Sequence, residues 1–271
     1  MRLTDVPPWD TRPLIAEIHG DLVALLASLR DTDWALPTEA GRWTVKDVAL
    51  HLLDGDLTQL SIGRDGELSG LLDTSGDYRA FVAALDAKNQ RWVEAAHVLS
   101  PRVVTGLLRW SGEQVGQHYA TVDLTGPAYV SWASDGTVPL WLHLAREMTE
   151  RWVHQQHIRD AVGLPGDHAR FLPAVLATFV WAFPHQYRPV AAPGTAVQLD
   201  FGDGSRWQLI RASGGWELDE GTAPGPVAAL RMPPRLAWRQ LTGLPVPAGG
   251  YRTEGDERLA APLLAVRGII V

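Results

Sequence analysis

A row of acidic and imidazole side chains marks residues 141–163, WLHLAREMTERWVHQQHIRDAVG. Read as a helix, this segment places His143, Glu147, Glu150, His154 and His157 at steps of four, three, four and three. At roughly 100° per residue, the five side chains lie within about 40° of one line along the helix. Glu150 and His154 form an E-x3-H pair, and residues four apart on a helix are close enough to share a metal ion. The segment therefore offers two ligands of a metal site.

A third ligand is His51, which lies two turns inside a predicted helix, in DVALHLLDGD. Facing helices of a bundle supply ligands to a shared site in its core. Two imidazole nitrogens and one carboxylate oxygen around a divalent ion leave coordination positions open, which is typical of catalytic zinc sites rather than structural ones. His51, Glu150 and His154 are thus candidate ligands of a divalent metal such as zinc.

A second interpretation of the same row is purely structural. In it, the row faces solvent as an ion-paired surface, while Trp141, Met148 and Trp152 face the core. His51 would then be a hydrogen-bonded core histidine. Burying the row without partners would cost up to several kcal/mol for each polar group. Composition and spacing leave both interpretations open.

Further polar residues near this site have roles that the sequence leaves open. His157, one turn beyond His154, is the candidate catalytic residue, either as an acid or base near the substrate or as a partner of the metal ligands. His143 and Glu147 can pair with each other. Metal-bound histidines usually donate their other ring N–H to an acceptor, and Asp54 or Asp56 could orient His51 in this way. Geometry favours Asp47, one turn before His51, but Asp47 is better interpreted as a helix cap.

Arginines are candidates for binding substrate carboxylates, because the guanidinium fork matches a carboxylate. They are Arg146, Arg151, Arg235 and Arg239, and each can equally be interpreted as half of a surface ion pair. The remaining histidines lack companions at metal-ligand spacing and are interpreted as structural. They are His97, His118 and His185.

The elements that must position these residues are helices, predicted over the first two thirds of the chain. They cover residues 13–29, 42–64, 77–100, 100–117 and 139–163. Thr44 and Asp47 form a T-x-x-D capping box, Ser100 precedes Pro101 at a helix start, and Gly163 ends the last helix. Several long helices joined by turns and one long loop predict a bundle with a crossover connection.

The pattern changes after about residue 168. FLPAVLATFVWAFPHQY predicts one more helix, and alternating TAVQLDF, RWQLIRA and GWELDE predict strands joined by hairpin-length turns. AALRM is a further candidate strand, and PRLAWRQLTG and GDERLAAPLLAVR are candidate helices, the last ending in GIIV. We therefore expect two domains: residues 1–168 form an all-α four-helix bundle, and residues 169–271 form a small α/β (α+β) domain with an antiparallel sheet.

Composition limits the classes of partner. The 271 residues carry a net charge of −7 with no run of Lys or Arg, so we expect no nucleic-acid partner. Neither a signal peptide nor an apolar run of roughly 20 residues is evident, so we expect a cytoplasmic protein without a membrane partner. G-x-G-x-x-G, P-loop and G-x-S-x-G motifs are lacking, which argues against nucleotide-dependent and serine-hydrolase activities. Cysteine is absent, so any sulfur chemistry must use a small-molecule thiol.

Several segments resemble a known family. RWTVKDVALHLLDGD, FVAALDAKNQRWV, LLRWSGEQV and EMTERWVHQQHIRDAVG are similar to the DinB-like family of the mycothiol-dependent maleylpyruvate isomerase type. FPHQYRP, AWRQLTG and EGDERLAAPLL resemble the small, sterol-carrier-like α/β domain that follows in those proteins. The resemblance covers nearly the whole chain. It implies a bundle that binds a divalent metal, commonly zinc, through the positions of His51, Glu150 and His154.

The resemblance also implies a reaction class. We expect a metal-dependent isomerase or S-transferase that uses mycothiol or a similar thiol as co-substrate and acts on a small electrophile, which can carry a carboxylate. The alternative is a non-catalytic protein that keeps a metal for stability and binds a small molecule in its C-terminal domain. Either would be a monomer or a dimer.

Overall fold

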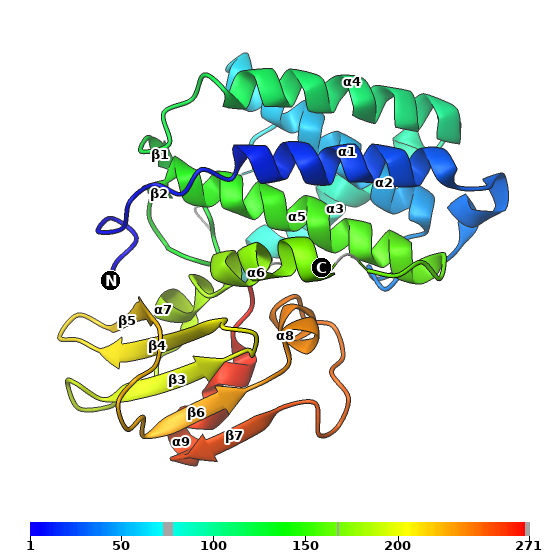
Figure 1. Ribbon diagram of the computed structural model, residues 1–271. Coiled ribbons are helices and arrows are strands. Elements are labelled where there is room, and N and C mark those ends of the chain that lie inside the picture. Colours follow the sequence, from blue (N-terminus) through cyan, green and yellow to red (C-terminus); the bar gives the residue numbers. More distant parts are fainter. Residues whose placement is uncertain (73–77, 167, 269–271) are drawn as a thin grey trace. The chain divides into compact units, whose positions relative to one another are not determined.

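The chain divides into two compact units in the computed structural model, which describes residues 1–72, 78–166 and 168–268 (Figure 1). The helical unit comprises Thr11–Val122 and Glu150–Gly166. The sheet unit comprises Met1–Asp10, Asp123–Thr149 and the described residues from 168 onward. The predicted domain boundary at residue 168 stays a prediction. The predicted fold class, a helical N-terminal region followed by an antiparallel-rich sheet, is confirmed.

The helical unit contains the helices that the sequence predicts and one short helix, η1, that was not predicted. In chain order they are α1 (Arg12–Ser28), the 3-10 helix η1 (Asp31–Ala35), α2 (Val45–Thr58), the π-helical turn η2 (Gln59–Arg64), α3 (Tyr78–Ala96), α4 (Pro101–Tyr119) and the second half of α5 (Leu140–Ala161). Contacts join α4 to α1 and α2, and α2 to α3. Asp77, the first residue of one predicted helix, lies outside the described residues.

Local signals fix the ends of the helices that carry the candidate ligands. The Thr44 side chain accepts from the backbone of Asp47, and the Asp47 carboxylate accepts from the backbone N–H of Thr44 at 2.9 Å, so the predicted capping box starts α2. Gly163 has φ +70° after α5, and Leu164 N–H bonds back to Arg159 O at 2.9 Å. This backbone conformation suits glycine and closes the helix.

Apolar side chains from each helix fill the core of the helical unit. α2 contributes Val48, Ala49 and Leu52, and α4 contributes Val104 and Leu108. Further members come from the other helices: Leu22, Leu25, Leu26, Val93 and Ile158. Burial of this apolar surface is the main stabilising contribution to such a unit, and it holds α2 and α5 in one packed body.

The sheet unit contains a five-stranded sheet with the order β5-β4-β3-β6-β7, which Figure 1 shows from top to bottom. The strands are β3 (Ala196–Asp200), β4 (Arg206–Arg211), β5 (Trp216–Glu220), β6 (Ala228–Arg231) and β7 (Arg252–Gly255). The helices of this unit are α6 (His168–Phe179), α7 (Ala182–Gln186), α8 (Pro234–Leu241), α9 (Glu257–Ala260), the 3-10 helix η3 (Ala261–Ala265) and the first half of α5. A small ribbon pairs β1 (Pro127–Ala128) with β2 (Val138–Pro139).

The structure corrects details of the sheet unit. The segment predicted as one helix before the sheet is split into α6 and α7, the predicted last helix is α9 followed by η3, and β7 was not predicted. The GIIV end lies outside the described residues except for Gly268. β3 pairs with β6 in parallel, although an antiparallel sheet was expected. Hairpins join only β3 to β4 and β4 to β5, while the β5–β6 connection crosses to the other side of β3.

A buried glutamine anchors this crossover connection. Gln198, in the central strand β3, is 2% exposed. Its Nε2 donates to Gly221 O at 3.1 Å and to Trp207 O at 2.8 Å, and its Oε1 accepts from Ala223 N–H at 2.9 Å. A buried polar group requires such partners, so Gln198 stabilises the loop that makes β6 parallel.

We expect Gly255→Ala to destabilise the sheet unit more than Gly249→Ala. Both glycines have positive φ, +79° and +78°, where a Cβ costs about 1–2 kcal/mol. A Cβ on Gly255 would also lie 2.1 Å from Val227 O, whereas one on Gly249 would meet nothing within 4 Å. Urea unfolding of both variants measures the difference. Equal free energies of unfolding would contradict the close approach of β7 to Val227.

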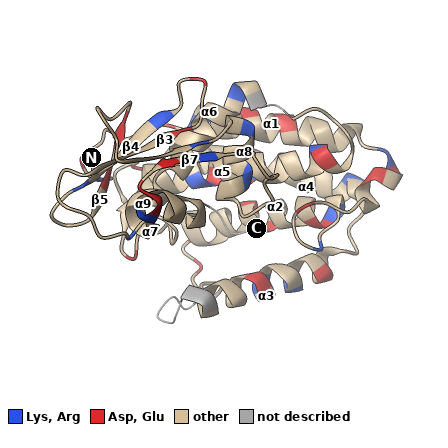
Figure 2. Ribbon diagram, turned by 90° about the horizontal axis from the view of Figure 1, so that it is seen from below, with Lys and Arg blue, Asp and Glu red and all other residues tan. Residues whose placement is uncertain are grey.

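Charges of both signs follow one another along α3 in Figure 2, as its sequence requires.

Across residues 1–72, 78–166 and 168–268, the structure has no helix with the length and apolar character needed to cross a bilayer.

Candidate metal centre

Three predicted ligands converge inside the helical unit. Nε2 of His51 lies 3.0 Å from Oε1 of Glu150, and Nε2 of His154 lies 3.3 Å from the same oxygen. The ligand atoms of the three residues all lie within 4.8 Å of one another. α2 supplies His51, and α5 supplies Glu150 and His154, so residues 99 positions apart meet at one carboxylate oxygen. The cluster has the residue types and proximity of a metal site.

Burial varies across this cluster. The His154 side chain is 3% exposed, while those of His51 and Glu150 are 14% and 18% exposed. The His51 and His154 rings lie edge to face, with centroids 4.8 Å apart. Two of the three side chains therefore retain contact with solvent.

The charges of the cluster suit a cation. Burial alone would raise the pKa of Glu150, but hydrogen bonds from His154 and His51 outweigh it and hold this pKa well below its ordinary value. Burial lowers the pKa of His154 because it disfavours the charged imidazolium, and this effect exceeds the opposing influence of Glu150. At neutral pH the cluster thus presents an ionised carboxylate and a neutral imidazole, the forms that bind metals.

A further observation supports the binding of a divalent metal by these residues. Nδ1 of His51 is buried without a hydrogen-bond partner among the described residues, so it sets no competing orientation for the ring. The Nε2 atoms of both histidines point at the carboxylate instead. Two nitrogens and one oxygen form the donor set of many open zinc sites.

His157 lies against the far side of His154. Its Nδ1 is 3.3 Å from Nδ1 of His154, and the two rings are edge to face with centroids 5.3 Å apart. His157 is fully buried. The catalytic role predicted for His157 stays a prediction; the contact shows that it adjoins a candidate ligand.

No aspartate orients His51, whose Nδ1 has no hydrogen-bond partner among the described residues, and the interpretation of Asp47 as a helix cap is confirmed. Asp47 caps α2 and lies 3.2 Å from Nδ1 of His97, while Asp54 pairs with Lys88 at 3.2 Å. The third choice, Asp56, accepts from Ser111 Oγ at 2.7 Å and pairs with Arg151. Each carboxylate is engaged elsewhere because the side chains that approach α2 come from α3, α4 and α5, which sequence spacing did not reveal.

Arg151 and Asp56 form a buried ion pair next to the cluster. Their side chains are 4% and 2% exposed, and Ser111 of α4 adds a hydrogen bond to the carboxylate. Arg151 was a candidate for binding substrate, but its guanidinium is buried in this pair. The pair therefore links α2 to α5 close to the candidate ligands.

The interpretation that the row on α5 faces solvent is wrong. His154, His157 and Glu147 are buried, as the metal interpretation requires, but Trp152 and Met148 on other sides of the helix are buried as well. His143 and Glu147 approach at 3.9 Å, the pairing that was considered for them, and Arg146 also pairs with Glu147.

The other candidate residues do not belong to this cluster. Arg239 donates to Pro245 O at 3.4 Å and lies over the Trp238 ring, and Arg235 is exposed. His185 lies 3.6 Å from Asp135, and the His118 ring adjoins Tyr119. These positions lie outside the cluster of His51, Glu150 and His154.

Trp43 is a residue of the site that the sequence did not single out. Its ring packs against His51 at 4.9 Å between centroids and lies 6.4 Å from the His154 ring. Trp43 Nε1 donates to Gln90 Oε1 of α3 at 3.1 Å, which fixes the indole. Its place directly before the capping Thr44 was the one available signal.

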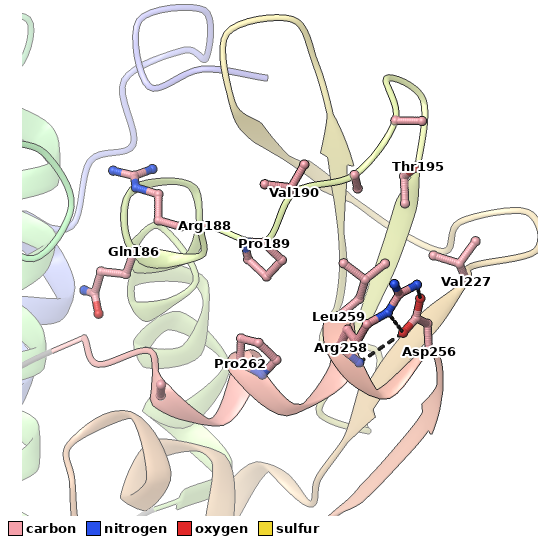
Figure 3. Close-up of a pocket in the computed structure, with 13 residues that line it drawn as sticks. Gln186, Arg188, Pro189, Val190, Thr195, Val227, Asp256, Arg258, Leu259 and Pro262 are labelled. Carbon is pink, nitrogen blue, oxygen red and sulfur yellow. Dashed lines mark hydrogen bonds and ion pairs between the residues drawn. The ribbon is translucent and has the colours of Figure 1, made fainter.

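A separate groove of about 760 Å³ lies in the sheet unit (Figure 3). Much of its lining is apolar, including Pro189, Val190, Leu259 and Pro262. At one end, the guanidinium of Arg258 is held by the Asp256 carboxylate at 2.8 Å. The dimensions suit a small molecule.

The fold and the site together define a class: a helical unit with a three-ligand candidate metal centre, combined with an antiparallel-rich sheet unit. The model of the family described as the mycothiol maleylpyruvate isomerase N-terminal domain matches residues 15–159, which include His51, Glu150 and His154. This match spans more than half of the chain, so the chain belongs to that family.

Solved structures show the same fold. The chain is similar to a crystal structure of the mycothiol-dependent maleylpyruvate isomerase, with a TM-score of 0.58 and 12% identity. A crystal structure of a histidine-to-alanine mutant of that isomerase has a TM-score of 0.58 and 11% identity. Each comparison covers 94% of this chain and 97% of the other. No curated protein sequence matches the chain.

Proposed function

We propose that this protein is a thiol-dependent isomerase whose centre is formed by His51, Glu150 and His154. The observation that carries the proposal is the convergence of their ligand atoms within 4.8 Å, in a chain that belongs to a family named for such an enzyme. The co-substrate is mycothiol or a similar small thiol. The cysteine-free sequence fits this assignment, since the sulfur must then come from outside the chain.

His51, Glu150 and His154 would hold a divalent metal, and zinc suits their donor set. Such a metal, when bound, stabilises a thiolate at neutral pH. The ionised Glu150 offsets the positive charge, and the neutral His154 ring can bind without a net loss of protons. Trp43 packs against His51 and limits the water around it.

The substrate is proposed to be a small electrophile with an activated double bond, such as maleylpyruvate. Addition of a thiolate to one alkene carbon leaves a single bond about which the adduct rotates. Elimination then restores the double bond in the other geometry and releases the thiol unchanged. If the adduct were protonated and released instead, the product would be a thioether and the protein an S-transferase.

Metal content and turnover test this proposal together. Protein purified without chelator should carry about one divalent ion per chain and should isomerise maleylpyruvate when mycothiol is added. Removing the ion with a chelator should abolish turnover, and zinc should restore it, because the metal would stabilise the attacking thiolate. Full turnover by metal-free protein would contradict the proposal, and a stable thioether product would identify the transferase instead.

The groove of the sheet unit supports a second candidate function, non-catalytic binding of a small molecule. Its volume of about 760 Å³ and largely apolar lining fit a partly apolar ligand. In that case the metal would stabilise the fold alone. Zinc-loaded protein would then bind no thiol by calorimetry, whereas the isomerase should bind mycothiol.

A further inference from the structure

His154 is held at both ring nitrogens. Nε2 faces Glu150 Oε1 at 3.3 Å, and Nδ1 faces Nδ1 of His157 at 3.3 Å. His154 and His157 are 2% and 0% exposed. His51 differs, because its Nδ1 has no hydrogen-bond partner in the described parts of the chain. Among the described residues, only His154 of the two candidate histidine ligands therefore has a hydrogen-bond partner at the ring nitrogen that faces away from Glu150.

The contact with Glu150 determines the direction of the hydrogen bond to His157. An ionised carboxylate only accepts hydrogen bonds, so Nε2 of His154 carries the proton when it faces Glu150. Nδ1 of the neutral ring is then an acceptor. The hydrogen bond between the two rings must run from Nδ1–H of His157 to Nδ1 of His154.

A divalent cation at the centre would require the opposite arrangement. Nε2 of His154 then needs its lone pair for the metal, and the proton of the neutral ring moves to Nδ1. His154 becomes the donor, and Nδ1 of His157 must accept. The proton of neutral His157 then lies on its Nε2. Each ring keeps one proton, so the exchange releases none.

We propose that His157 is a positioning residue, whose Nδ1 donates to His154 before metal binding and accepts from it afterwards. An imidazole can do both because each nitrogen serves as donor or acceptor according to tautomer. His157 thus holds the His154 ring with Nε2 toward Glu150 in both states. This inference rests on the proposed metal role of His154 and assigns His157 a role that acts through that ligand.

The tautomers of the two rings give the direct test. Long-range proton–nitrogen correlation spectra of histidine-labelled protein should show His154 protonated at Nε2 and His157 at Nδ1 without metal. One equivalent of zinc should move the protons to Nδ1 of His154 and Nε2 of His157. Zinc binding without this exchange would overturn the inference and leave the proposed function standing. Failure to bind zinc would overturn the proposed function, and with it the inferred exchange of tautomers between His154 and His157.

Two variants at one position separate hydrogen bonding from packing. His157→Phe keeps a ring but removes both nitrogens, and should weaken zinc binding about 10–100-fold, as loss of a partner of a metal ligand does. His157→Gln can donate or accept and should bind zinc nearly as tightly as the wild type. Competition with a chelator measures the affinities, and the visible spectrum of the cobalt form should shift only in His157→Phe.

His19→Phe is the control, since His19 is a partly buried histidine of the same unit whose Nε2 hydrogen-bonds to Leu108 O at 2.9 Å instead. It should leave zinc affinity unchanged. Equal affinities for His157→Phe and His157→Gln would contradict the positioning role. If His157→Phe fails to fold, the His157→Gln affinity and the wild-type tautomers still decide the question.

Discussion

The Glu150→Gln variant is expected to lose its metal and its turnover while keeping its fold. Glutamine has nearly the shape of glutamate, so the packing of α5 is preserved. It lacks the charge, however, and Glu150 Oε1 is the atom on which His51 and His154 converge, at 3.0 and 3.3 Å. Loss of a partner behind a ligand already costs about 10–100-fold in affinity, so loss of the ligand itself should cost more than about 100-fold.

Zinc affinity, metal content and isomerase turnover measure this loss. His154→Ala should behave in the same way, although it also removes buried side-chain volume and should lower the free energy of unfolding. The control is His118→Ala, because His118 lies outside the cluster and its ring adjoins Tyr119. Tight zinc binding by Glu150→Gln would exclude this carboxylate as a ligand, whatever the turnover.

The proximity of the candidate ligands Glu150 and His154 on α5 could be predicted because its geometry is local. Glu150 and His154 are four residues apart, and any helix brings such side chains together. The choice of His51 needed only residue type and a helix start, and the capping box of Thr44 supplied that start. These signals lie within a few turns of the residues they position, so they can be recognised in the sequence itself.

The partners of these residues could not be predicted, because they come from distant elements. Asp56 faces Arg151 rather than His51, and this depends on the rotation of α2 against α5. Trp43 is fixed by Gln90, 47 residues away. The parallel pairing of β3 with β6 could not be predicted for the same reason. Hairpin turns specify which strands are neighbours, whereas a crossover connection is stabilised by contacts between distant residues, such as those of Gln198.

The Asp56→Asn variant is expected to destabilise the protein strongly. Asp56 is 1% exposed, and its carboxylate meets both Arg151 and Ser111 Oγ. Asparagine keeps the size but removes the negative charge opposite a guanidinium that is itself 4% exposed. Removing one partner of a buried ion pair costs about 3–5 kcal/mol, because the remaining charge stays buried without its counter-charge.

Urea unfolding of metal-free protein measures this cost, and Asp54→Asn is the matched control. Asp54 lies two residues earlier on α2 and pairs with Lys88, but those side chains are 15% and 27% exposed. Solvent screens such a pair, so its loss should cost at most about 1 kcal/mol. The double variant Asp56→Leu, Arg151→Met should recover much of the stability, since apolar side chains can replace a buried ion pair.

Zinc affinity of the same variants shows whether the ion pair matters to the site. Arg151 follows Glu150 directly on α5, and Asp56 lies one and a half turns beyond His51 on α2, so the pair fixes the two helices that supply the ligands. If it sets their register, Asp56→Asn should weaken zinc binding and the double variant should restore only part of it. If stability falls while zinc affinity is unchanged, the core of the unit alone is sufficient to bring His51 to Glu150.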